Sequence, residues 1–280
     1  MTRGPILEGV KELLRVGLES WFPSGFAALA HVADRMRLGR GEPEQALLPL
    51  LCDTGEAAVD VGANHGSYTV ALLPLATRVF AVEANPKLAY ILRARVAAAV
   101  REGRVVVLEL ALSGASGEID LFVPDDAPAL ASVEPTVARR MPGHVVHVPC
   151  DTLDRLDLPR IGFIKIDVEG HEEEVLAGGA GLIARDRPTL LVEAEERHRP
   201  GSLRRIRERL EAAGYRGFFL SGGRLRPVAE FDAAAMQNRS ALNEAGTHRR
   251  SGSIYINNFV FVARDGVIRA LADARWLPSS

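Results

Sequence analysis

The sequence predicts an α/β protein whose mostly parallel sheet carries helices on both faces. Short apolar runs alternate with segments of helical length from residue 57 onward, and a glycine turn separates the first run from the segment after it. Alternating strands and helices of this length pack as parallel strands covered by helices.

Length and composition bound the class of protein. The chain has 280 residues, of which 47% are hydrophobic and 25% are charged, as in ordinary globular proteins. Its net charge of −2 gives no overall basic balance, so we do not expect nucleic acid as a partner. Cys52 and Cys150 form no C-x-x-C pair, and two lone thiols fit a reducing compartment.

The sequence contains no recognisable targeting or membrane segment. Residues 1–11 lack the apolar region of a signal peptide. No apolar run approaches the roughly 20 residues that a membrane-spanning helix needs. We therefore expect a soluble cytoplasmic protein with no membrane span.

The chain divides into a helical N-terminal extension, 1–54, and a main domain, 55–280. Apolar residues at helical spacing predict helices over 5–22, 26–38 and 44–51. Three roles for the extension stay open: a lid over the cofactor, a dimer contact that would make the protein a homo-oligomer, and packing on one flank of the sheet.

The main domain is expected to hold a seven-stranded sheet. The predicted strands are 57–62, 78–84, 105–112, 163–168, 189–194, 215–220 and 259–264. The predicted helices are 66–75, 86–101, 170–179 and 202–213, with Ser202 as an N-cap. Residues 118–123 and 145–148 are expected to pair as an antiparallel ribbon.

Residues 221–257 form a long insertion between the last two strands. The insertion contains the basic residues Arg224, Arg226, Arg239, His248, Arg249 and Arg250. Long loops at sheet ends often contact substrates. The cluster at 248–250 therefore meets an anionic acceptor on one interpretation and is a solvated basic loop on the other.

The glycine turn indicates which ligand the sheet binds. Gly62 and Gly66 are separated by three residues, and Asn64 stands where a dinucleotide turn has its second glycine. Asp60, two residues before Gly62, would repel a pyrophosphate and attract an ammonium or sulfonium group. S-adenosylmethionine carries both cations and no phosphate. The alternative is a tight turn that binds no ligand.

Glu83 ends the second predicted strand, about 20 residues after the first glycine of the turn. A carboxylate at this place accepts hydrogen bonds from ribose hydroxyls, in NAD sites and S-adenosylmethionine sites alike. The alternative is a carboxylate that only favours the N-terminus of the following helix.

Acidic residues gather at the ends of the fourth and fifth predicted strands. Lys165, Asp167 and Glu169 share one face of the fourth strand, because strand side chains alternate. Glu193 and Glu195 repeat the pattern on the fifth. If the strands are neighbours, up to four carboxylates converge on one crevice. An ion pair between Lys165 and a carboxylate is the structural alternative.

His171 precedes a helix that begins with Glu172, Glu173 and Glu174. The helix N-terminus favours a neutral imidazole, as a general base requires, whereas the glutamates favour the protonated form. A catalytic role and a structural role for His171 both stay open.

These residues together resemble the FkbM family of S-adenosylmethionine-dependent methyltransferases. Asp60-Val-Gly-Ala-Asn64-x-Gly66 matches the first motif of the family, and Glu83-Ala-Asn-Pro86 resembles the second, with Ala84 where proline is usual. The most specific match is Ile164-Lys-Ile-Asp-Val-Glu-Gly-His-Glu172. Asp151-Thr-Leu153, Arg187-Pro188 and Asn258-Phe-Val-Phe-Val262 follow the family order, so the resemblance covers about 55–264.

The resemblance implies a Rossmann-like class I methyltransferase fold with S-adenosylmethionine as cofactor. The implied cofactor-binding residues are Asp60, Gly62, Asn64, Gly66, Glu83, Ala84, Asn85 and Asp167. It also implies O-methylation of a hydroxyl on a sugar, polyketide or other natural product, without naming the acceptor.

The expected reaction is direct in-line methyl transfer, with His171 or Asp167 taking the hydroxyl proton. Alternatively, a divalent cation such as Mg²⁺, held by Asp167, Glu169 or Glu193, lowers the pKa of the hydroxyl. Two rival functions are an NAD-dependent oxidoreductase, which the missing second glycine and Asp60 disfavour, and a methyltransferase-like binding domain without turnover.

Overall fold

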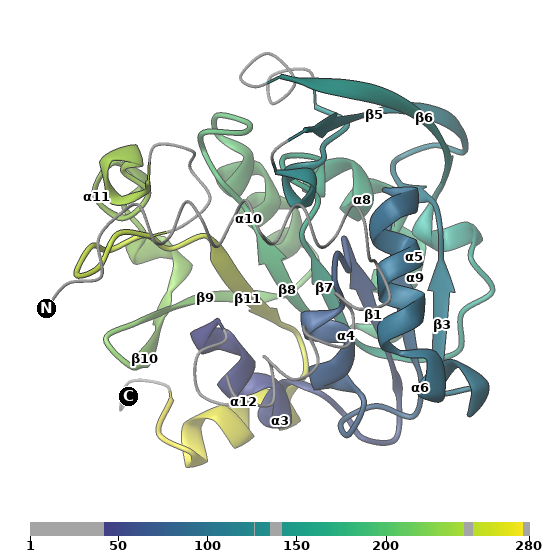
Figure 1. Cartoon of the computed structure of the whole chain (residues 1–280). Coiled ribbons are helices and arrows are strands. Elements are labelled where there is room, and N and C mark those ends of the chain that lie inside the picture. The colour runs from purple at the N-terminus through teal and green to yellow at the C-terminus, as the bar shows by residue number, and fades with distance from the viewer. Residues whose placement is uncertain (1–41, 126, 135–141, 244–248, 277–280) are drawn as a thin grey trace, which may run out of the picture.

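A large twisted sheet forms the centre of the molecule (Figure 1). The computed structural model describes residues 42–125, 127–134, 142–243 and 249–276. The strands follow the order β10-β9-β11-β8-β7-β1-β2-β3. Their bounds are β1 Ala57–Val61, β2 Val79–Val82, β3 Val105–Leu108, β7 Ile161–Ile166, β8 Thr189–Glu193, β9 Arg216–Ser221, β10 Arg224–Pro227 and β11 Asn258–Val262.

Most neighbouring strands of this sheet are parallel, as expected. β1 pairs in parallel with β2 and β7, and further parallel pairs join β2 to β3 and β7 to β8. β11 runs antiparallel between β8 and β9. This mostly parallel sheet confirms the Rossmann-like methyltransferase fold that the sequence resemblance implies.

The sheet has eight strands rather than the predicted seven. The extra strand, β10, lies in the 221–257 insertion and pairs antiparallel with β9. Gly222 and Gly223 both adopt positive φ, 59° and 76°, which suits the two-residue turn of a hairpin. The two glycines therefore reverse the chain immediately after β9, and the insertion begins as a strand.

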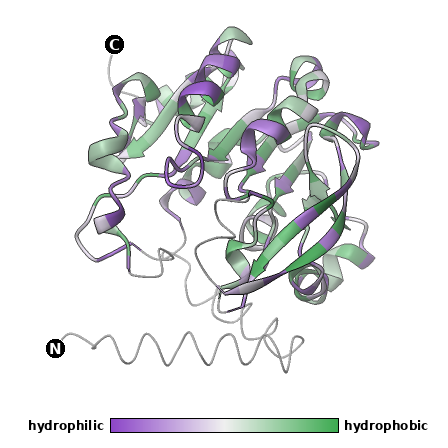
Figure 2. Ribbon diagram, turned by 90° about the horizontal axis from the view of Figure 1, so that it is seen from above, coloured by the Kyte–Doolittle hydropathy of each residue, from purple (hydrophilic) through white to green (hydrophobic). Residues whose placement is uncertain are grey.

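Helices cover both faces of the sheet. One core cluster joins the strands to the three helices of the first face through Leu176, Leu182 and Leu203. A second cluster joins the strands to the helices of the opposite face through residues such as Leu48, Leu72 and Leu271. Figure 2 shows mostly hydrophobic strands and helices that carry both colours. The first face carries α8 Glu172–Gly178, α9 Ala180–Asp186 and α10 Ser202–Ala212; the second carries α3 Leu48–Leu51, α4 Ser67–Leu72, α5 Pro86–Arg95 and α12 Asp265–Asp273.

The predicted antiparallel ribbon is confirmed, and it belongs to a second, three-stranded sheet. β5 Gly117–Pro124 pairs antiparallel with β6 Gly143–Asp151, which also pairs in parallel with β4 Ala111–Leu112. The predicted strand 105–112 is therefore wrong as one element, because it divides into β3 and β4 in different sheets.

Helix boundaries differ from the expectation in several places. The predicted helix 86–101 is interrupted at Val96, so α6 Ala97–Arg101 follows α5. The N-cap of α10 is Gly201, with φ of 74°, rather than Ser202. The expected helix 44–51 is η1 Pro43–Leu47 followed by α3. The expected helices 5–22 and 26–38 lie outside the described residues, as do residues 1–41 of the expected extension.

The remaining elements are short. They are η2 Pro128–Leu130, η3 Leu153–Arg155, η4 Val228–Glu230, α11 Ala233–Met236 and η5 Arg239–Ala241.

None of the described helices is long and apolar enough to span a bilayer.

The turn after β1 packs closely against the end of β7. β1 lies between β2 and β7, where the strand order reverses and open α/β sheets bind their ligands. Gly62 has φ of 75°, and a Cβ atom on it would lie 1.7 Å from the main-chain oxygen of Asp167. Only glycine allows this approach, so the turn and the carboxyl end of β7 form one wall.

We predict that Gly62→Ala destabilises the protein more than Gly103→Ala, the matched control. Gly103 has a similar φ of 70° but nothing within 4 Å of its added Cβ, so its substitution costs about 1–2 kcal/mol from the left-handed backbone alone. At Gly62 the overlap with Asp167 adds a further cost of about 1–3 kcal/mol. Urea unfolding measures both, and equal losses would contradict the close packing.

Candidate active site

A cleft that is open to solvent lies at the carboxyl ends of β1, β2 and β7. Open α/β sheets bind ligands at this place. Apolar side chains of the cleft come from α5 and from the region of the small sheet, including Leu88, Leu112 and Leu121. The predicted site residues that line it are Gly62, Asn64, Glu83, Ala84, Asp167, Glu169 and His171.

The Glu83 carboxylate is fixed by main-chain donors. Its Oε2 atom accepts a hydrogen bond from Asn64 N at 2.7 Å, and its Oε1 atom accepts one from Asn85 N at 2.8 Å. Burial raises the pKa of Glu83 to about 7, while these two amide groups act in the opposite direction. Glu83 therefore holds the glycine turn against the end of β2 and also faces the cleft.

Asn64 completes the turn in the left-handed region, with φ of 50°. Its Oδ1 atom accepts a hydrogen bond from His65 N at 2.8 Å, and its Nδ2 atom donates to the Ala129 carbonyl at 3.4 Å. Asparagine tolerates this backbone conformation better than most residues. The side chain therefore links the turn to the segment that follows β5.

Asp60 lies beneath the cleft and is not among the residues that line it. It is 2% exposed, and its Oδ2 atom accepts a hydrogen bond from Thr69 Oγ1 at 2.6 Å. Burial raises the pKa of Asp60 to about 6. In this position Asp60 ties β1 to α4, and its predicted contact with a cofactor stays a prediction.

Gly66 and Asn85 support the cleft from outside. Gly66 is the N-cap of α4 with φ of 81°, and a Cβ atom there would lie 2.5 Å from Leu92 Cδ1. The Asn85 side chain caps α5 by accepting a hydrogen bond from Lys87 N at 3.1 Å. Both were predicted as cofactor-binding residues, and neither lines the cleft.

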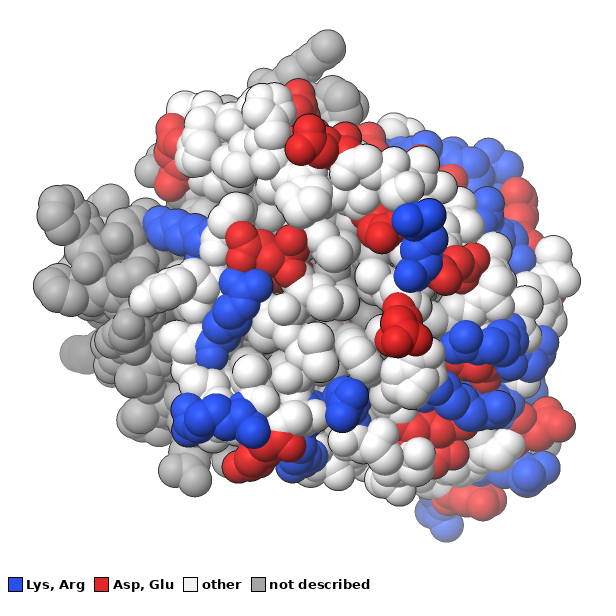
Figure 3. All heavy atoms as spheres, turned by 90° about the vertical axis from the view of Figure 1, so that its right-hand side faces the viewer, with Lys and Arg blue, Asp and Glu red and all other residues white. Residues whose placement is uncertain are grey.

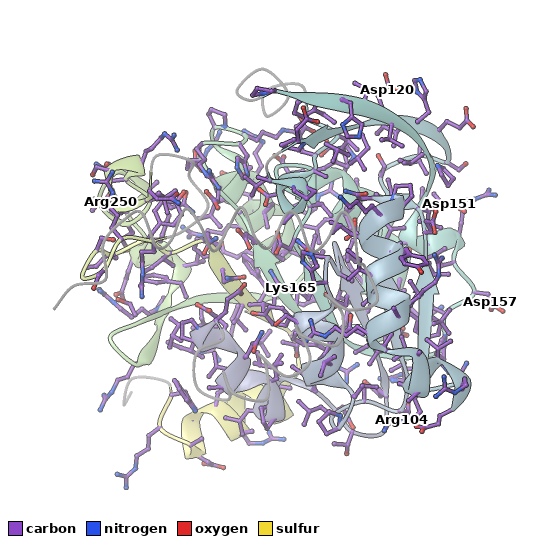
Figure 4. All side chains as sticks on the ribbon, viewed as in Figure 1. Arg104, Asp120, Asp151, Asp157, Lys165 and Arg250 are labelled. Carbon is purple, nitrogen blue, oxygen red and sulfur yellow. The ribbon has the colours of Figure 1, made fainter. Side chains whose placement is uncertain are left out.

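Lys165 lies buried at the centre of the sheet (Figure 4). Its Nζ atom is 3.5 Å from Asp167 Oδ2 and 3.8 Å from Glu193 Oε2, and it donates a hydrogen bond to Asn258 Oδ1 at 3.0 Å. Burial acts to lower the pKa of Lys165, but the carboxylates around it outweigh burial and hold that pKa above its usual value. The structural ion pair expected for Lys165 is therefore present.

The carboxylates at and after the ends of β7 and β8 lie close to one another because the two strands are neighbours, but of the four only Asp167 and Glu169 line the cleft. Burial and the charge of Asp167 raise the pKa values of Glu169 and Glu193 well above their ordinary range. Glu195 differs: although burial acts to raise its pKa, the Arg197 guanidinium and the Tyr255 hydroxyl hold it below that range. Burial therefore favours the neutral form of both Glu169 and Glu193.

The structure does not bring Asp167, Glu169 and Glu193 together as a metal-ligand set. In the described part of the chain, the group of acidic and histidine side chains with suitable spacing is Glu134, His171 and Glu174. Lys165 itself supplies the cation beside Asp167 and Glu193. Glu169 Oε2 turns instead toward His198 Nδ1, 3.2 Å away.

Both ring nitrogens of His171 contact polar side chains. Nε2 lies 2.9 Å from Ser113 Oγ, and Nδ1 lies 2.9 Å from Glu134 Oε1. The ring is 8% exposed and lines the cleft. A proton acceptor needs a free lone pair directed at the substrate, so His171 would have to release one of these partners before acting as a base.

The basic residues of the insertion lie on the surface. Arg224, Arg226 and Arg250 are exposed, and Arg226 pairs with Glu230. Figure 4 places Arg250 at the periphery, far from Lys165, and His248 lies outside the described residues. On another face, which carries the β3 edge, Figure 3 shows acidic and basic side chains interspersed. The described arginines fit the solvated alternative.

No motif or spacing in the sequence pointed to Ser113 or Glu134. Both approach the cleft from the region of the small sheet: Ser113 follows β4, and Glu134 follows the segment 129–133, which contributes to the lining. Such positions are set by long-range packing, which residue spacing does not report.

Comparison with known proteins identifies the family. Residues 60–216 match the model of the methyltransferase FkbM domain, which is more than half of the chain. The chain belongs to the FkbM methyltransferase family. This segment contains the glycine turn, Glu83, β7 with Asp167, and His171, whereas the predicted motif at β11 lies outside it.

A curated relative is the hexuronic acid methyltransferase AglP of Haloferax volcanii. The two proteins are 32% identical over 162 residues, which are 55% of this chain and 65% of AglP. The match therefore spans slightly less than two thirds of that protein.

Two methyltransferases are among the solved structures with a similar fold. The FkbM methyltransferase of Methylobacillus flagellatus has a TM-score of 0.49 at 17% identity, covering 75% of this chain and 44% of that one. The O-methyltransferase of Bacillus cereus, in complex with SAH, has a TM-score of 0.45 at 14% identity, covering 90% and 97%.

We predict that Glu83→Gln changes how stability depends on pH. An acid whose pKa is raised on folding, here from 4.5 to about 7, stabilises the fold below pH 4.5, and this contribution is lost as the pH rises to 7. Glutamine has no such proton. Between pH 4.5 and 7 the free energy of unfolding of the variant should therefore fall less steeply than that of the wild type, and the two slopes should differ by up to about 1.4 kcal/mol per pH unit.

Urea unfolding at pH 5, 6 and 7 measures this difference. Glu118→Gln, on an exposed side chain of β5, is the control and should keep the wild-type slope. Identical slopes for Glu83→Gln and the wild type would contradict the raised pKa.

Proposed function

We propose that the protein is an S-adenosylmethionine-dependent methyltransferase that methylates a hydroxyl group of a sugar or another small natural product. The observation that carries this proposal is the cleft between the Gly62 turn and Glu83, inside the segment that matches the FkbM domain. A Rossmann-like sheet binds its ligand at this place.

The polar groups of the cleft suit S-adenosylmethionine. Each oxygen of Glu83 accepts one main-chain hydrogen bond and keeps a lone pair for a ribose hydroxyl. Leu88, Leu112 and Leu121 offer an apolar wall to the adenine ring. Asp167 presents a carboxylate to the cationic end of the cofactor.

The same charges disfavour NAD. Asp167 lines the cleft, and Glu83 lies across it, so a pyrophosphate there would lie beside the Asp167 carboxylate. The turn also has Asn64 in place of the glycine that brings a dinucleotide close to the backbone. The oxidoreductase alternative is therefore the weaker one.

Asp167 is the group that we propose as proton acceptor. Its carboxylate lines the cleft, and its side chain is 27% exposed, whereas both nitrogens of His171 already have partners. In the reaction, a bond forms between the acceptor oxygen and the methyl carbon as the bond from that carbon to sulfur breaks, and the hydroxyl proton passes to Asp167. S-adenosylhomocysteine is the second product.

A sugar acceptor is supported by the relative AglP, which is a hexuronic acid methyltransferase. The carboxylates near the crevice also suit a polyhydroxylated acceptor, because ionised carboxylates accept several hydrogen bonds from hydroxyl groups. The carboxylates favour neutral sugars and AglP favours uronic acids, so we place both first among the acceptors to be tested.

We predict that the protein binds S-adenosylmethionine and not NAD. Glu83→Gln should weaken this binding about 10- to 100-fold, because a hydrogen bond to a charged group contributes about 1.5–3 kcal/mol. Isothermal titration calorimetry measures the affinities, with Glu118→Gln as the control. Binding of NAD alone, or unchanged affinity in Glu83→Gln, would contradict the cofactor assignment.

We further predict that Asp167→Asn lowers turnover by a factor of about 100 or more, the usual effect of losing a general base. Formation of S-adenosylhomocysteine with neutral sugars and uronic acids as acceptors measures turnover. The exposed Asp157→Asn is the control. Full activity in Asp167→Asn together with loss of activity in His171→Ala would assign the role of general base to His171. Cofactor binding without turnover of any acceptor would favour the alternative of a binding domain without activity.

A further inference from the structure

A histidine and two glutamates converge beside the cleft. His171 Nδ1 lies 2.9 Å from Glu134 Oε1 and 3.7 Å from Glu174 Oε2. One ligating atom from each side chain lies within 4.8 Å of the other two. Three such donors with this spacing are able to share one ion.

The imidazole is held in the orientation that a metal ligand needs. Its Nε2 atom lies 2.9 Å from Ser113 Oγ, and the ring is 8% exposed. A metal-bound histidine donates its second ring N–H to a hydrogen-bond acceptor, which fixes the ring and its tautomer. The Ser113 hydroxyl is such an acceptor, so Nδ1 is left to face the two glutamates.

Charge and access also favour a divalent cation. The two carboxylates offset two of the three positive charges that a divalent ion and Arg199 bring together, and their side chains are 20% and 31% exposed, so the position is reachable from solvent. Arg199 Nη1 holds Glu174 through both oxygens, at 2.7 and 2.6 Å, and thereby orients it. Arg199 Nε also lies 3.4 Å from Glu173 Oε1, which gives the guanidinium a second carboxylate partner.

We propose that Glu134, His171 and Glu174 bind one divalent transition-metal ion. Imidazole favours zinc and related ions, whereas magnesium and calcium prefer oxygen ligands alone. Glu134 follows the cleft-lining segment 129–133, and the other two ligands belong to the start of α8. The ion therefore joins two walls of the cleft.

Calorimetric titration of the untagged, chelator-treated full chain with Zn²⁺ tests the proposal. We expect one equivalent to bind, at least tenfold more weakly in Glu134→Gln and in His171→Ala. Mg²⁺ should not compete at equal concentration. In the wild type, Co²⁺ should give visible absorption bands that Zn²⁺ abolishes.

Glu208→Gln is the control. Glu208 is exposed, pairs with Arg204 four residues before it, and is not a member of the group. This variant should bind Zn²⁺ like the wild type. No stoichiometric Zn²⁺ binding, or equal binding in wild type and Glu134→Gln, would overturn the proposal. If His171→Ala does not fold, Glu134→Gln still tests the proposal. The titration uses neither cofactor nor acceptor, so its outcome is independent of the proposed activity.

Discussion

One buried ammonium group holds the carboxyl ends of the central strands together. Lys165 on β7 contacts Glu193 on β8 and Asn258 on β11, in addition to Asp167. Asn258 Nδ2 in turn donates a hydrogen bond to Glu42 at 3.0 Å. Removing a partner from a buried charge is costly, so each of these groups stabilises the position of the others.

The site has two regions along one edge of the sheet, one beside β2 and one beside β8. On the β2 side, Glu83 and the Gly62 turn form a rigid wall through main-chain hydrogen bonds. On the β8 side, the lysine neutralises part of a crowded group of carboxylates, and Asp167 lies between the two regions. The proposed transfer of a methyl group to a hydroxyl would need two such regions to meet at a single point.

Residue spacing predicted what neighbouring parallel strands bring together. It placed Gly62, Glu83, Asp167 and His171 near one cleft, because the carboxyl ends of parallel strands meet at one edge. Spacing did not predict which side chains contact one another. Strand periodicity assigns Lys165 and Asp167 to one face, but it does not show that the Lys165 ammonium is the cation beside Asp167. The contact between Glu134 and His171 joins residues far apart in the sequence, so no local pattern predicts it.

β10 also determines how the large sheet ends. An outermost strand exposes unpaired main-chain groups to which a strand of another molecule can add. Here that strand is only four residues long, carries exposed arginines at 224 and 226, and ends in Pro227, which has no N–H to donate. Charge and proline are features by which natural sheets resist edge-to-edge aggregation. The insertion thus protects this margin of the sheet from aggregation.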